Sequence, residues 1–513
     1  MRSFPSAVGV ASVLLVAAGM SALACSSSTP AAEQPAVVPP VPTATTEPDA
    51  GTEGGLTTIA SSAALSALSI SSGVLSPAFD PSVLDYTISS LNSLVPVDVT
   101  ATTADGLTLT VNGKPATTAV ISSLTLTPRE DIIVNVASAS GESKTYTVHY
   151  LPPDFPAYSV TNPSPTLAGS EPILLTPALG WLAIVDRAGA PLYYRRPPAP
   201  IGTTPATVAD FRPQTFDTGQ RGYSYAVQNE GIHLLDDHFR EKTTLSVLAN
   251  RDHGVIPADV HDFLVLGPEH YLLLGYAPKT LDLSEIDDAW STQAPVTAAV
   301  IQEVDHGVVL FEWDSDDAPS LFTDSVFSNA FTDAATSDYV HANSFQIDPV
   351  DGNLIVSLRH TSSILKISRT TGATLWTLGG KSDDFGLTTA QRTAFQHHAN
   401  KQSDGTLLVF DNGALSPAGD HPTRVVSYVL DESAKTVTSF TEITTRPSAQ
   451  PDTTFMGSAF MMNANRYLIG WGGRSDSSAT WPAVTEVAGG SVVWSLTFTT
   501  PSTFSYRAHP MTP

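Results

Sequence analysis

Cysteine and positive charge are scarce in this sequence. The 513 residues include a single cysteine, Cys25, so the chain forms no intramolecular disulfide. Lysine and arginine total 25 against 50 aspartate and glutamate residues, a formal net charge of −25. Such a charge repels phosphate backbones, which argues against nucleic acid as a partner. The length exceeds what one domain needs, so we expect at least two folded units.

Long apolar runs are equally rare, and the amino terminus carries the main one. Arg2 precedes the run Ala7–Met20, which is short for a membrane span and is flanked like a signal peptide. Residues 1–24 resemble a bacterial lipoprotein signal, in which Cys25 becomes the lipidated first residue of the mature protein. Ordinary secretion is the alternative. The resemblance implies an exported protein, lipid-anchored in the cell envelope at the periplasm or the cell surface.

Two further segments precede the main body of the chain. Residues 25–61 are rich in Pro, Ala and Thr, a composition that cannot offset the entropy of ordering and predicts a disordered tether. Residues 62–151 show short alternating strands with turn signals at Asp105-Gly106 and Asn112-Gly113, typical of a small β-sandwich. The segments Leu75–Pro81 and Lys144–Val148 resemble the cadherin-like β-sandwich repeat of bacterial surface proteins. That resemblance implies spacing or adhesion rather than chemistry.

Residues 152–513 repeat one pattern of apolar strands and loops. The strand closings Val309–Trp313, Thr374–Leu378 and Val492–Leu496 are similar, and no amphipathic helix of any length is evident. Small sheets that cannot cover their own faces indicate a β-propeller, and we predict six blades. The fold class is thus all-β, a six-bladed β-propeller preceded by a small β-sandwich. The units are Trp181–Arg195, Tyr223–Leu248, His261–Trp313, His341–Gly379, His397–Thr444 and Met456–Leu496.

Three of these units begin with histidine. His261, His341 and His397 each precede a turn and then an apolar strand, and the whole chain has only 13 histidines. Equivalent positions of successive blades face one axis, so the three imidazoles are expected to converge near the starts of the channel-lining strands. His398 follows His397 directly. Because strand side chains alternate, we expect only one of these two rings to face the channel.

Arg359 bears on what such a histidine cluster binds. Three neutral imidazoles alone suit zinc, as in hydrolytic enzymes. Arg359 closes the strand after His341 and is expected to point toward the same axis. A guanidinium disfavours a dication and favours a tetrahedral oxyanion such as sulfate or phosphate. The residues alone leave both a metal site and an anion site open.

Several motifs in order along the chain carry a further resemblance. From about Gly180 to Leu496 the sequence resembles the bacterial arylsulfate sulfotransferases, on the motifs Val260–Phe263, His341–Phe345, Ser357–His360, Gly372–Gly380, Phe395–Ala399, Leu408–Gly413, Met456–Ser458 and Gly470–Gly472. The family is a six-bladed propeller that moves a sulfuryl group from an aryl sulfate to a phenol through a sulfated histidine. It does so without the nucleotide sulfate donor PAPS.

The resemblance implies roles for individual residues. His397 matches the nucleophile, with His398 as the fallback, and His261, His341 and Arg359 match the groups that hold the sulfate oxygens. Asn343 is implied to bind substrate. A neutral imidazole can attack sulfur, and a phenol with a pKa near 10 leaves readily. The implied partners are a phenolic sulfate donor and a phenol acceptor.

No cofactor is implied, and neither a Walker A motif nor a dinucleotide fingerprint is present. Two other functions stay open. One is a metal-dependent hydrolase built on the three histidines, and the other is a non-enzymatic surface propeller that binds anionic ligands. The aromatic side chains of Tyr193, Tyr194, Tyr223 and Tyr225 fit either an aryl-stacking role or the blade core.

Overall fold

A computed structural model gives the structure of this chain. It describes residues 63–511 except for positions 72–73, 77, 90–96, 117–118, 125–130, 150, 152–153, 199–206, 218, 333–334, 414–420, 446–451 and 475–479. The predicted signal peptide 1–24, the lipidation site Cys25 and the tether 25–61 lie outside the described residues. Within the described part, no helix is long and apolar enough to cross a membrane.

The first folded region is a β-sandwich of two sheets. One sheet has the order β1 (Leu65–Ile70), β4 (Val97–Thr103), β7 (Ala119–Leu124). The other has the order β2 (Val74–Ser76), β3 (Asp85–Ser89), β9 (Ser143–His149), β8 (Ile132–Ala137), β5 (Thr108–Val111), β6 (Lys114–Ala116). Alternate residues such as Ile132, Val134 and Val136 are buried, so the period-two pattern of the sequence supplies the core.

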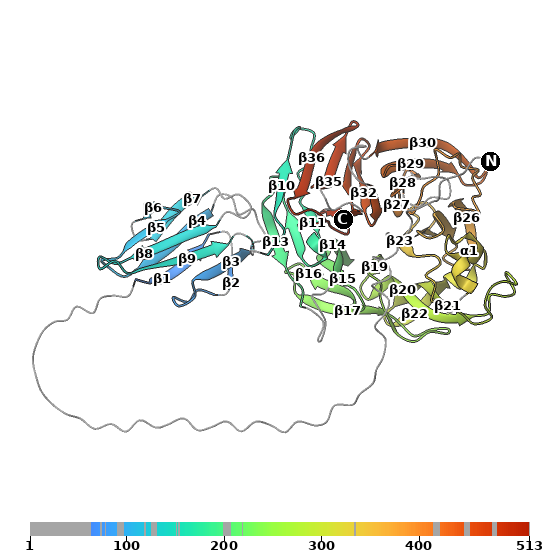
Figure 1. Cartoon of the computed structure of the whole chain (residues 1–513), viewed down its shortest axis with the longest axis horizontal. Helices are drawn as coiled ribbons and strands as arrows, with labels where there is room; N and C mark the ends of the chain where they lie inside the picture. The colour runs from blue at the N-terminus through green and yellow to red at the C-terminus, as the bar shows by residue number, and fades with distance from the viewer. Residues whose placement is uncertain are drawn as a thin grey trace, which may run out of the picture. The chain divides into compact units, whose positions relative to one another are not determined.

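Six further sheets form a ring around one axis, as Figure 1 shows. From the inner strand outward, the first three blades are β37 (Ala508–Pro510), β11 (Ile173–Leu175), β12 (Leu182–Val185), β13 (Pro191–Arg195); β14 (Val208–Asp217), β15 (Gln220–Val227), β16 (Gly231–Asp236), β17 (Glu241–Val247), β18 (Ile256–Pro257); and β19 (Phe263–Gly267), β20 (His270–Leu281), β21 (Ala294–Asp305), β22 (Val308–Asp314).

The other three blades are β23 (Ala342–Ile347), β24 (Leu354–Leu358), β25 (Ser363–Ile367), β26 (Thr374–Gly379); β27 (His397–Lys401), β28 (Thr406–Asp411), β29 (Arg424–Asp431), β30 (Thr436–Thr445); and β32 (Ser458–Asn463), β33 (Arg466–Gly470), β35 (Pro482–Ala488), β36 (Ser491–Phe498), β10 (Tyr158–Thr161). A small separate sheet pairs β31 (Thr453–Phe455) with β34 (Gly473–Arg474). The predicted all-β, six-bladed architecture is confirmed.

The ring is closed from both ends of the propeller segment. The late strand β37 is the inner strand of the first blade and pairs with β11, while the early strand β10 pairs with β36 at the outer edge of the last blade. Each closure ties segments more than 300 residues apart into one ladder, because His509 pairs with Leu174 and Tyr158 pairs with Phe498. The seam is thereby held by backbone hydrogen bonds in both the first and the last blade.

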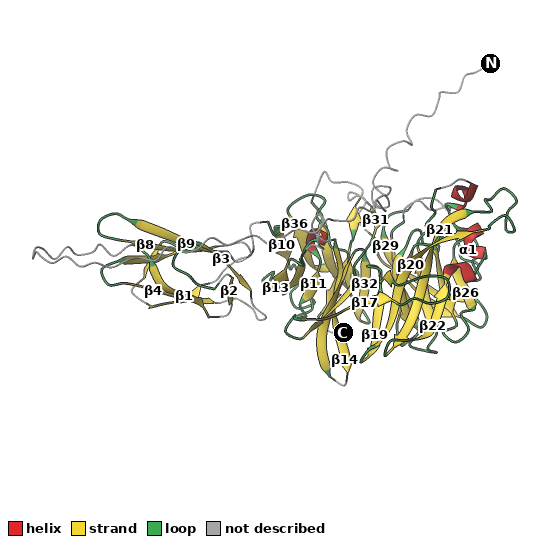
Figure 2. Cartoon of the chain, turned by 90° about the horizontal axis from the view of Figure 1, so that it is seen from below, coloured by secondary structure: helices red, strands yellow, loops and turns green. Residues whose placement is uncertain are grey.

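Helical turns are few, as the red segments of Figure 2 show. Most of them lie in the connection between β22 and β23, which leads to the inner strand of the fourth blade. Phe322 and Phe331 from this connection pack on Tyr339, three residues before β23 begins. The packing anchors the segment that carries Asp338 and His341. The helical elements are η2 (Pro177–Leu179), η3 (Ser315–Asp317), α1 (Ser320–Asp324) and η4 (Ser328–Thr332).

Candidate active site

The three in-phase histidines lie where the repeat predicts them. His261 stands two residues before β19, His341 immediately before β23, and His397 is the first residue of β27. All three therefore occupy the start of an inner strand, in blades three, four and five. The apolar strands noted in the sequence are β20, β24 and β28, the second strands of the same blades. The rings of His261 and His341 meet edge to face with centroids 4.8 Å apart.

Aspartates hold the first two histidine rings. Nδ1 of His261 lies 2.5 Å from Asp259 Oδ1, and Nδ1 of His341 lies 2.5 Å from Asp338 Oδ2. Each aspartate also accepts the backbone N–H of its histidine, so one short loop fixes both the main chain and the ring. The carboxylates favour Nδ1–H on both rings and leave Nε2 as the nitrogen that can contact a ligand.

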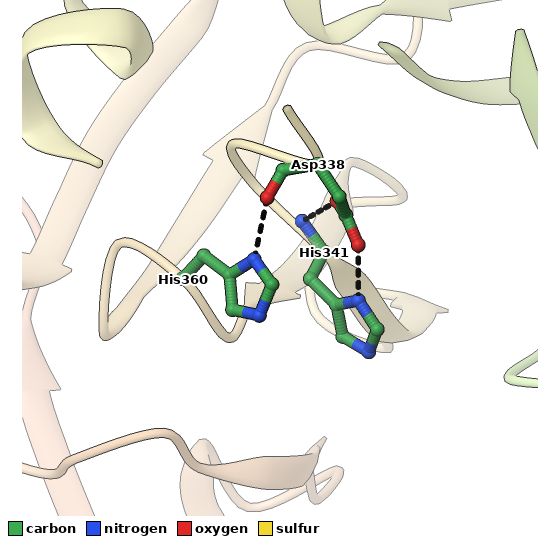
Figure 3. A group of neighbouring side chains, drawn as sticks. All are labelled: Asp338, His341 and His360. Atoms are coloured by element: carbon green, nitrogen blue, oxygen red, sulfur yellow. Dashed lines mark hydrogen bonds and ion pairs between the residues drawn. The ribbon is translucent and has the colours of Figure 1, made fainter. Parts of the chain in front are cut away.

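A fourth histidine, His360, belongs to the same cluster. Figure 3 shows its ring beside that of His341, below Asp338. Nδ1 of His360 donates to the backbone carbonyl of Asp338 at 2.6 Å, and the two rings stack at 4.7 Å with a 27° angle. Burial lowers the pKa of His360 to about 3. His360 is therefore neutral near pH 7, and its Nε2 is a hydrogen-bond acceptor.

Arg359 uses that acceptor. Arg359 directly follows β24, and its Nη1 lies 2.8 Å from His360 Nε2. Its Nη2 donates to the Thr454 carbonyl at 3.2 Å, and its Cζ lies 4.4 Å from the centroid of the Phe395 ring. The carboxylate of Asp338 acts on this guanidinium electrostatically, and among the described residues the buried Nε has no hydrogen-bond partner. Burial lowers the pKa of Arg359 to about 10, so the side chain stays charged at neutral pH.

His397 completes the group, which we call the cradle: His261, His341, Arg359, His360 and His397. Only 2 % of His397 is exposed. Its Nδ1 lies 2.7 Å from Asn412 Oδ1, and its Nε2 accepts the Met456 backbone N–H at 3.1 Å. Burial, followed by the positive charge of Arg359, holds the pKa of His397 well below its usual range. His397 is thus a neutral imidazole with an unprotonated Nε2, the form that a nucleophile requires.

His398 lies elsewhere along the channel. Its backbone has φ = 45°, and the pairing of β27 with β28 shifts register between His397 and Asn400. This bulge turns His398 into a cavity of about 430 Å³ lined by residues from all six inner strands. The bulge breaks the strand alternation, so the two adjacent rings lie in different places, and which of them reacts stays a prediction. His397 joins the cradle, and His398 lines this second space, the far cavity.

Comparisons with known proteins bear on this arrangement. Residues 259–507 match the family model described as arylsulfotransferase (ASST), and residues 65–151 match the model of the cadherin-like beta sandwich domain. Residues 259–507, just under half of the chain, are thus similar to the arylsulfotransferase family. All five cradle residues fall inside the matched range. The match supports an aryl sulfotransferase activity on phenolic substrates.

The other comparisons give distant likenesses. No curated protein matches it. A protein of unknown function from Bacteroides caccae has a TM-score of 0.42 at 14 % identity, covering 67 % of this chain and 100 % of its own. An auxiliary nutrient binding protein from Bacteroides ovatus has a TM-score of 0.31 at 12 % identity, covering 83 % and 85 %. With scores this low, neither likeness bears on activity.

Asn343 contacts the backbone next to His397 in the candidate site. The side chain is fully buried, and Nδ2 donates to the Gln396 carbonyl at 2.8 Å, one residue before His397. Its Oδ1 is buried without a hydrogen-bond partner. The contact steadies the backbone that carries the nucleophile candidate. Binding of substrate by Asn343 stays a prediction.

Three of the four tyrosines considered in the sequence, Tyr193, Tyr223 and Tyr225, pack in the core of the blades. Tyr193 and Tyr223 stack on opposite sides of Phe239, with centroids 3.9 Å and 4.3 Å from its ring, and Tyr225 stacks on His233 at 4.7 Å. An aromatic ring closer to the cradle is Phe327, which is 39 % exposed and meets His360 edge to face at 4.7 Å. Nothing in the repeat pattern marked Phe327, because it comes from the irregular connection before β23.

One cluster in the arylsulfotransferase domain has the composition of a metal site. Asp338, His341 and His360 each place a ligand-type atom within 4.8 Å of the others. Asp338 already binds Nδ1 of His341 and, through its carbonyl, Nδ1 of His360, while Arg359 occupies His360 Nε2. A guanidinium at that position opposes a dication. Among the described residues, His261 and His397 do not join this cluster.

Proposed function

We propose that the protein is a PAPS-independent aryl-sulfate sulfotransferase that uses His397 as nucleophile. One observation carries the proposal: the buried, charged Arg359 makes its hydrogen bonds to a neutral histidine and a backbone carbonyl, and it lies beside the neutral imidazole of His397. Asp338 acts on Arg359 electrostatically without a hydrogen bond between them, and burying a charge that is only partly compensated is costly, so such a site is suited to an anionic ligand. A sulfate ester supplies the missing negative charge and places sulfur next to a nucleophile.

The other cradle residues complete the anion site. Arg359 Nε is a buried donor without a partner, and His261 and His341 have Nδ1 committed to aspartates. Burial lowers the pKa of the His341 ring in the free protein, and an anion bound beside Nε2 opposes that lowering because its charge favours the protonated ring. The protonated His341 ring then donates Nε2–H to a sulfuryl oxygen, and together with Arg359 it stabilises the negative charge that those oxygens carry in the transition state.

The transfer takes place in two displacements. In the first, the lone pair of His397 Nε2 forms an N–S bond while the S–O bond to the aryl group breaks, and the electron pair leaves with the phenolate oxygen. In the second, an acceptor phenol loses its proton to solvent water and its oxygen attacks sulfur. The N–S bond then breaks, and its electron pair returns to Nε2. Neither step needs an oxidant, a metal ion or a nucleotide.

Phe327 offers an aromatic ring against which the aryl group of a substrate can pack. The ring is the exposed aromatic that contacts the cradle through His360, and it comes from a connection rather than from a blade strand. Aromatic faces and edges attract other rings by about 0.5–1.5 kcal/mol beyond burial. We assign Phe327 to the donor or acceptor ring on this basis.

An assay with 4-nitrophenyl sulfate tests the activity. The purified chain is incubated with this donor, with and without a phenol acceptor and with and without a chelator. Acceptor-dependent release of nitrophenol that survives chelation supports the proposal. Release abolished by the chelator would instead favour a metal-dependent hydrolase. Binding of sulfate esters without any turnover would leave a non-enzymatic, anion-binding propeller.

We also propose export and lipid attachment through Cys25, with the segment after it acting as a tether for the folded domains. The sequence pattern of residues 1–25 supports this placement. In a bacterial host, the wild-type chain is expected in the membrane fraction and in the detergent phase of an extraction. Cys25→Ser is expected to move it to the soluble exported fraction. Recovery of both forms in the same fraction would contradict lipidation.

A further inference from the structure

We propose that Asn412 is the positioning residue that fixes His397 in the Nδ1–H tautomer and so reserves Nε2 for the sulfuryl group. The inference rests on the proposed function for its meaning, but the tautomer itself is a property of the resting protein. Asn412 follows β28, fifteen residues after His397, and is fully buried. Its Oδ1 lies 2.7 Å from His397 Nδ1.

The orientation of the Asn412 amide follows from its other contacts. Nδ2 donates to the Thr453 carbonyl at 2.9 Å and to the Met456 carbonyl at 3.1 Å. A flipped amide would face both carbonyls with an oxygen and lose both bonds, leaving buried polar groups unpaired. Oδ1 must therefore face His397, and an amide oxygen only accepts. Hence Nδ1 carries the proton, and neutral His397 has its lone pair on Nε2.

The partner of His397 differs from those of the other cradle histidines. Asp259 and Asp338 are carboxylates that accept Nδ1–H, whereas Asn412 is a neutral amide and fixes the tautomer without adding negative charge. The difference suits separate tasks. The carboxylates hold the rings of His261 and His341 in place beside the anion, and His397 must stay unprotonated at Nε2 until it attacks.

The neutral amide also matters after the first displacement. Sulfated His397 keeps Nδ1–H and gains an N–S bond, so the ring carries a positive charge beside the negative sulfuryl group. A positively charged imidazole is a good leaving group for the second displacement. A carboxylate at position 412 would accept that proton and leave a neutral, less reactive ring.

Asn412 also positions the segment Thr453–Met456. Besides the two carbonyls that Asn412 holds, this segment supplies the Thr454 carbonyl to Arg359 and the Met456 N–H to His397 Nε2. Met456 has φ = 62° and Gly457 has φ = 110°, so the chain adopts an unusual turn at the nucleophile. After sulfuryl transfer, the Met456 N–H that faces Nε2 lies next to the new sulfuryl oxygens.

The charged and titratable groups around His397 come from several elements. Arg359 follows β24, and His261 and His341 precede β19 and β23, each with its aspartate. Asp411, at the end of β28, is turned to Arg424 at 2.9 Å. Asn412→Asp would thus add a carboxylate in direct contact with the ring, and we expect the protonation midpoint of His397 to rise by about 1–3 pH units.

Long-range ¹H–¹⁵N correlation spectra of the full chain, labelled at histidine nitrogens, test the inference. The His397 signals are assigned by their loss in His397→Gln. Wild type is expected to show a neutral ring with Nδ1–H at pH 7, and Asn412→Asp a ring whose Nε2 becomes protonated at higher pH than in wild type. Thr423→Val is the structural control, because Thr423 bonds the Asn412 carbonyl and the Thr453 N–H without touching His397.

The outcomes separate the inference from the proposed function. An Nε2–H tautomer in wild type would overturn the role of Asn412, whatever the enzyme does. An equal change of the His397 signals in Thr423→Val would reduce Asn412 to a structural role. The predicted tautomer in a protein without sulfuryl transfer would uphold the positioning and contradict the proposed function. If both hold, Asn412→Asp should move the acidic limb of the reaction upward by the same number of pH units as the NMR titration.

Discussion

Two regions of the central channel contain arginine and histidine but pair them differently. In the cradle, Arg359 bonds a neutral histidine and a carbonyl, and the carboxylate of Asp338 acts on it electrostatically rather than through a hydrogen bond. Beside the far cavity, Arg507 pairs with Asp210 at 3.3 Å and Asp262 at 3.4 Å, and those carboxylates raise its pKa. Arg507 thus closes an internal charge balance, whereas Arg359 leaves one open for an external anion.

The histidines follow the same division. His509, beside the far cavity, lies 2.8 Å from Asp210 and belongs to the balanced network of Asp210, Arg212, Asp262 and Arg507. His397 lies beside the unbalanced arginine. The comparison indicates that arginine and histidine alone do not identify the reactive region of the channel. The partners of each charged side chain identify it.

The largest contrast is expected between the adjacent histidines. His397→Gln should lower turnover of 4-nitrophenyl sulfate by at least about 1000-fold, because it removes the nucleophile. His398→Gln should change turnover by less than about 10-fold, since His398 lines the far cavity. Equal losses in both variants, at unchanged folding by circular dichroism, would erase the distinction between the two regions.

The arginines provide the next contrast. Arg359→Met should reduce kcat/KM by about 100- to 1000-fold through loss of charge stabilisation. Its loss of stability should be smaller than that of Arg507→Met, because it removes hydrogen bonds to a neutral histidine and a carbonyl rather than two ion pairs. Arg507→Met should lower the free energy of unfolding by about 3–5 kcal/mol, because it leaves buried carboxylates short of a partner. Denaturant titrations and steady-state kinetics on both variants check the pair. A stability loss in Arg359→Met as large as that in Arg507→Met would show that Arg359 is structural.

The pH dependence of the first displacement gives a smaller but direct signal. The pKa of His397 lies well below 6.5, so the ring stays neutral and reactive as pH falls through 6.5. On the alkaline side, Arg359 loses its charge near its pKa of about 10, and the rate should fall there. Stopped-flow measurement of nitrophenolate release in a single turnover, without acceptor, separates these effects from acceptor ionisation. A rate that halves near pH 6.5 would contradict the neutral, buried His397.

The smallest effect concerns stability. Burial lowers the pKa of His341, His360, His397, His398 and His509 below the unfolded value near 6.5. As pH falls below 6.5, the unfolded chain binds protons that the folded chain does not. Stability should therefore fall, by up to about 1.4 kcal/mol per pH unit for each group. His360→Gln should flatten that slope in denaturant titrations between pH 7 and pH 4.5, and an unchanged slope would mean that His360 is not held neutral.

Repetition explains how much of this site was visible in the sequence. Six units with recurrent strands predicted six blades, and the phase of His261, His341 and His397 predicted their common end of the channel. Arg359 was predictable because it follows the strand paired with the one after His341. Asp259 and Asp338 left a local signal, an acidic residue two or three positions before each histidine.

The remaining residues come from irregular features that periodicity does not report. His360 and Asn412 act through contacts between turns, Phe327 lies in the connection before β23, and the direction of His398 depends on a β-bulge. None of these is set by strand alternation. Their roles depend on contacts between turns of neighbouring blades. These contacts form only when the propeller closes.

The most direct test of the central claim is to find the residue that carries the sulfuryl group. The protein is exposed to 4-nitrophenyl sulfate without acceptor, quenched under mildly alkaline conditions, digested and mapped by mass spectrometry with electron-transfer fragmentation. We predict sulfation on His397, its disappearance when a phenol is added, and its absence in His397→Gln. Sulfation on His398 or on another residue, or turnover with no sulfated peptide at all, would contradict the assignment of His397 as the nucleophile.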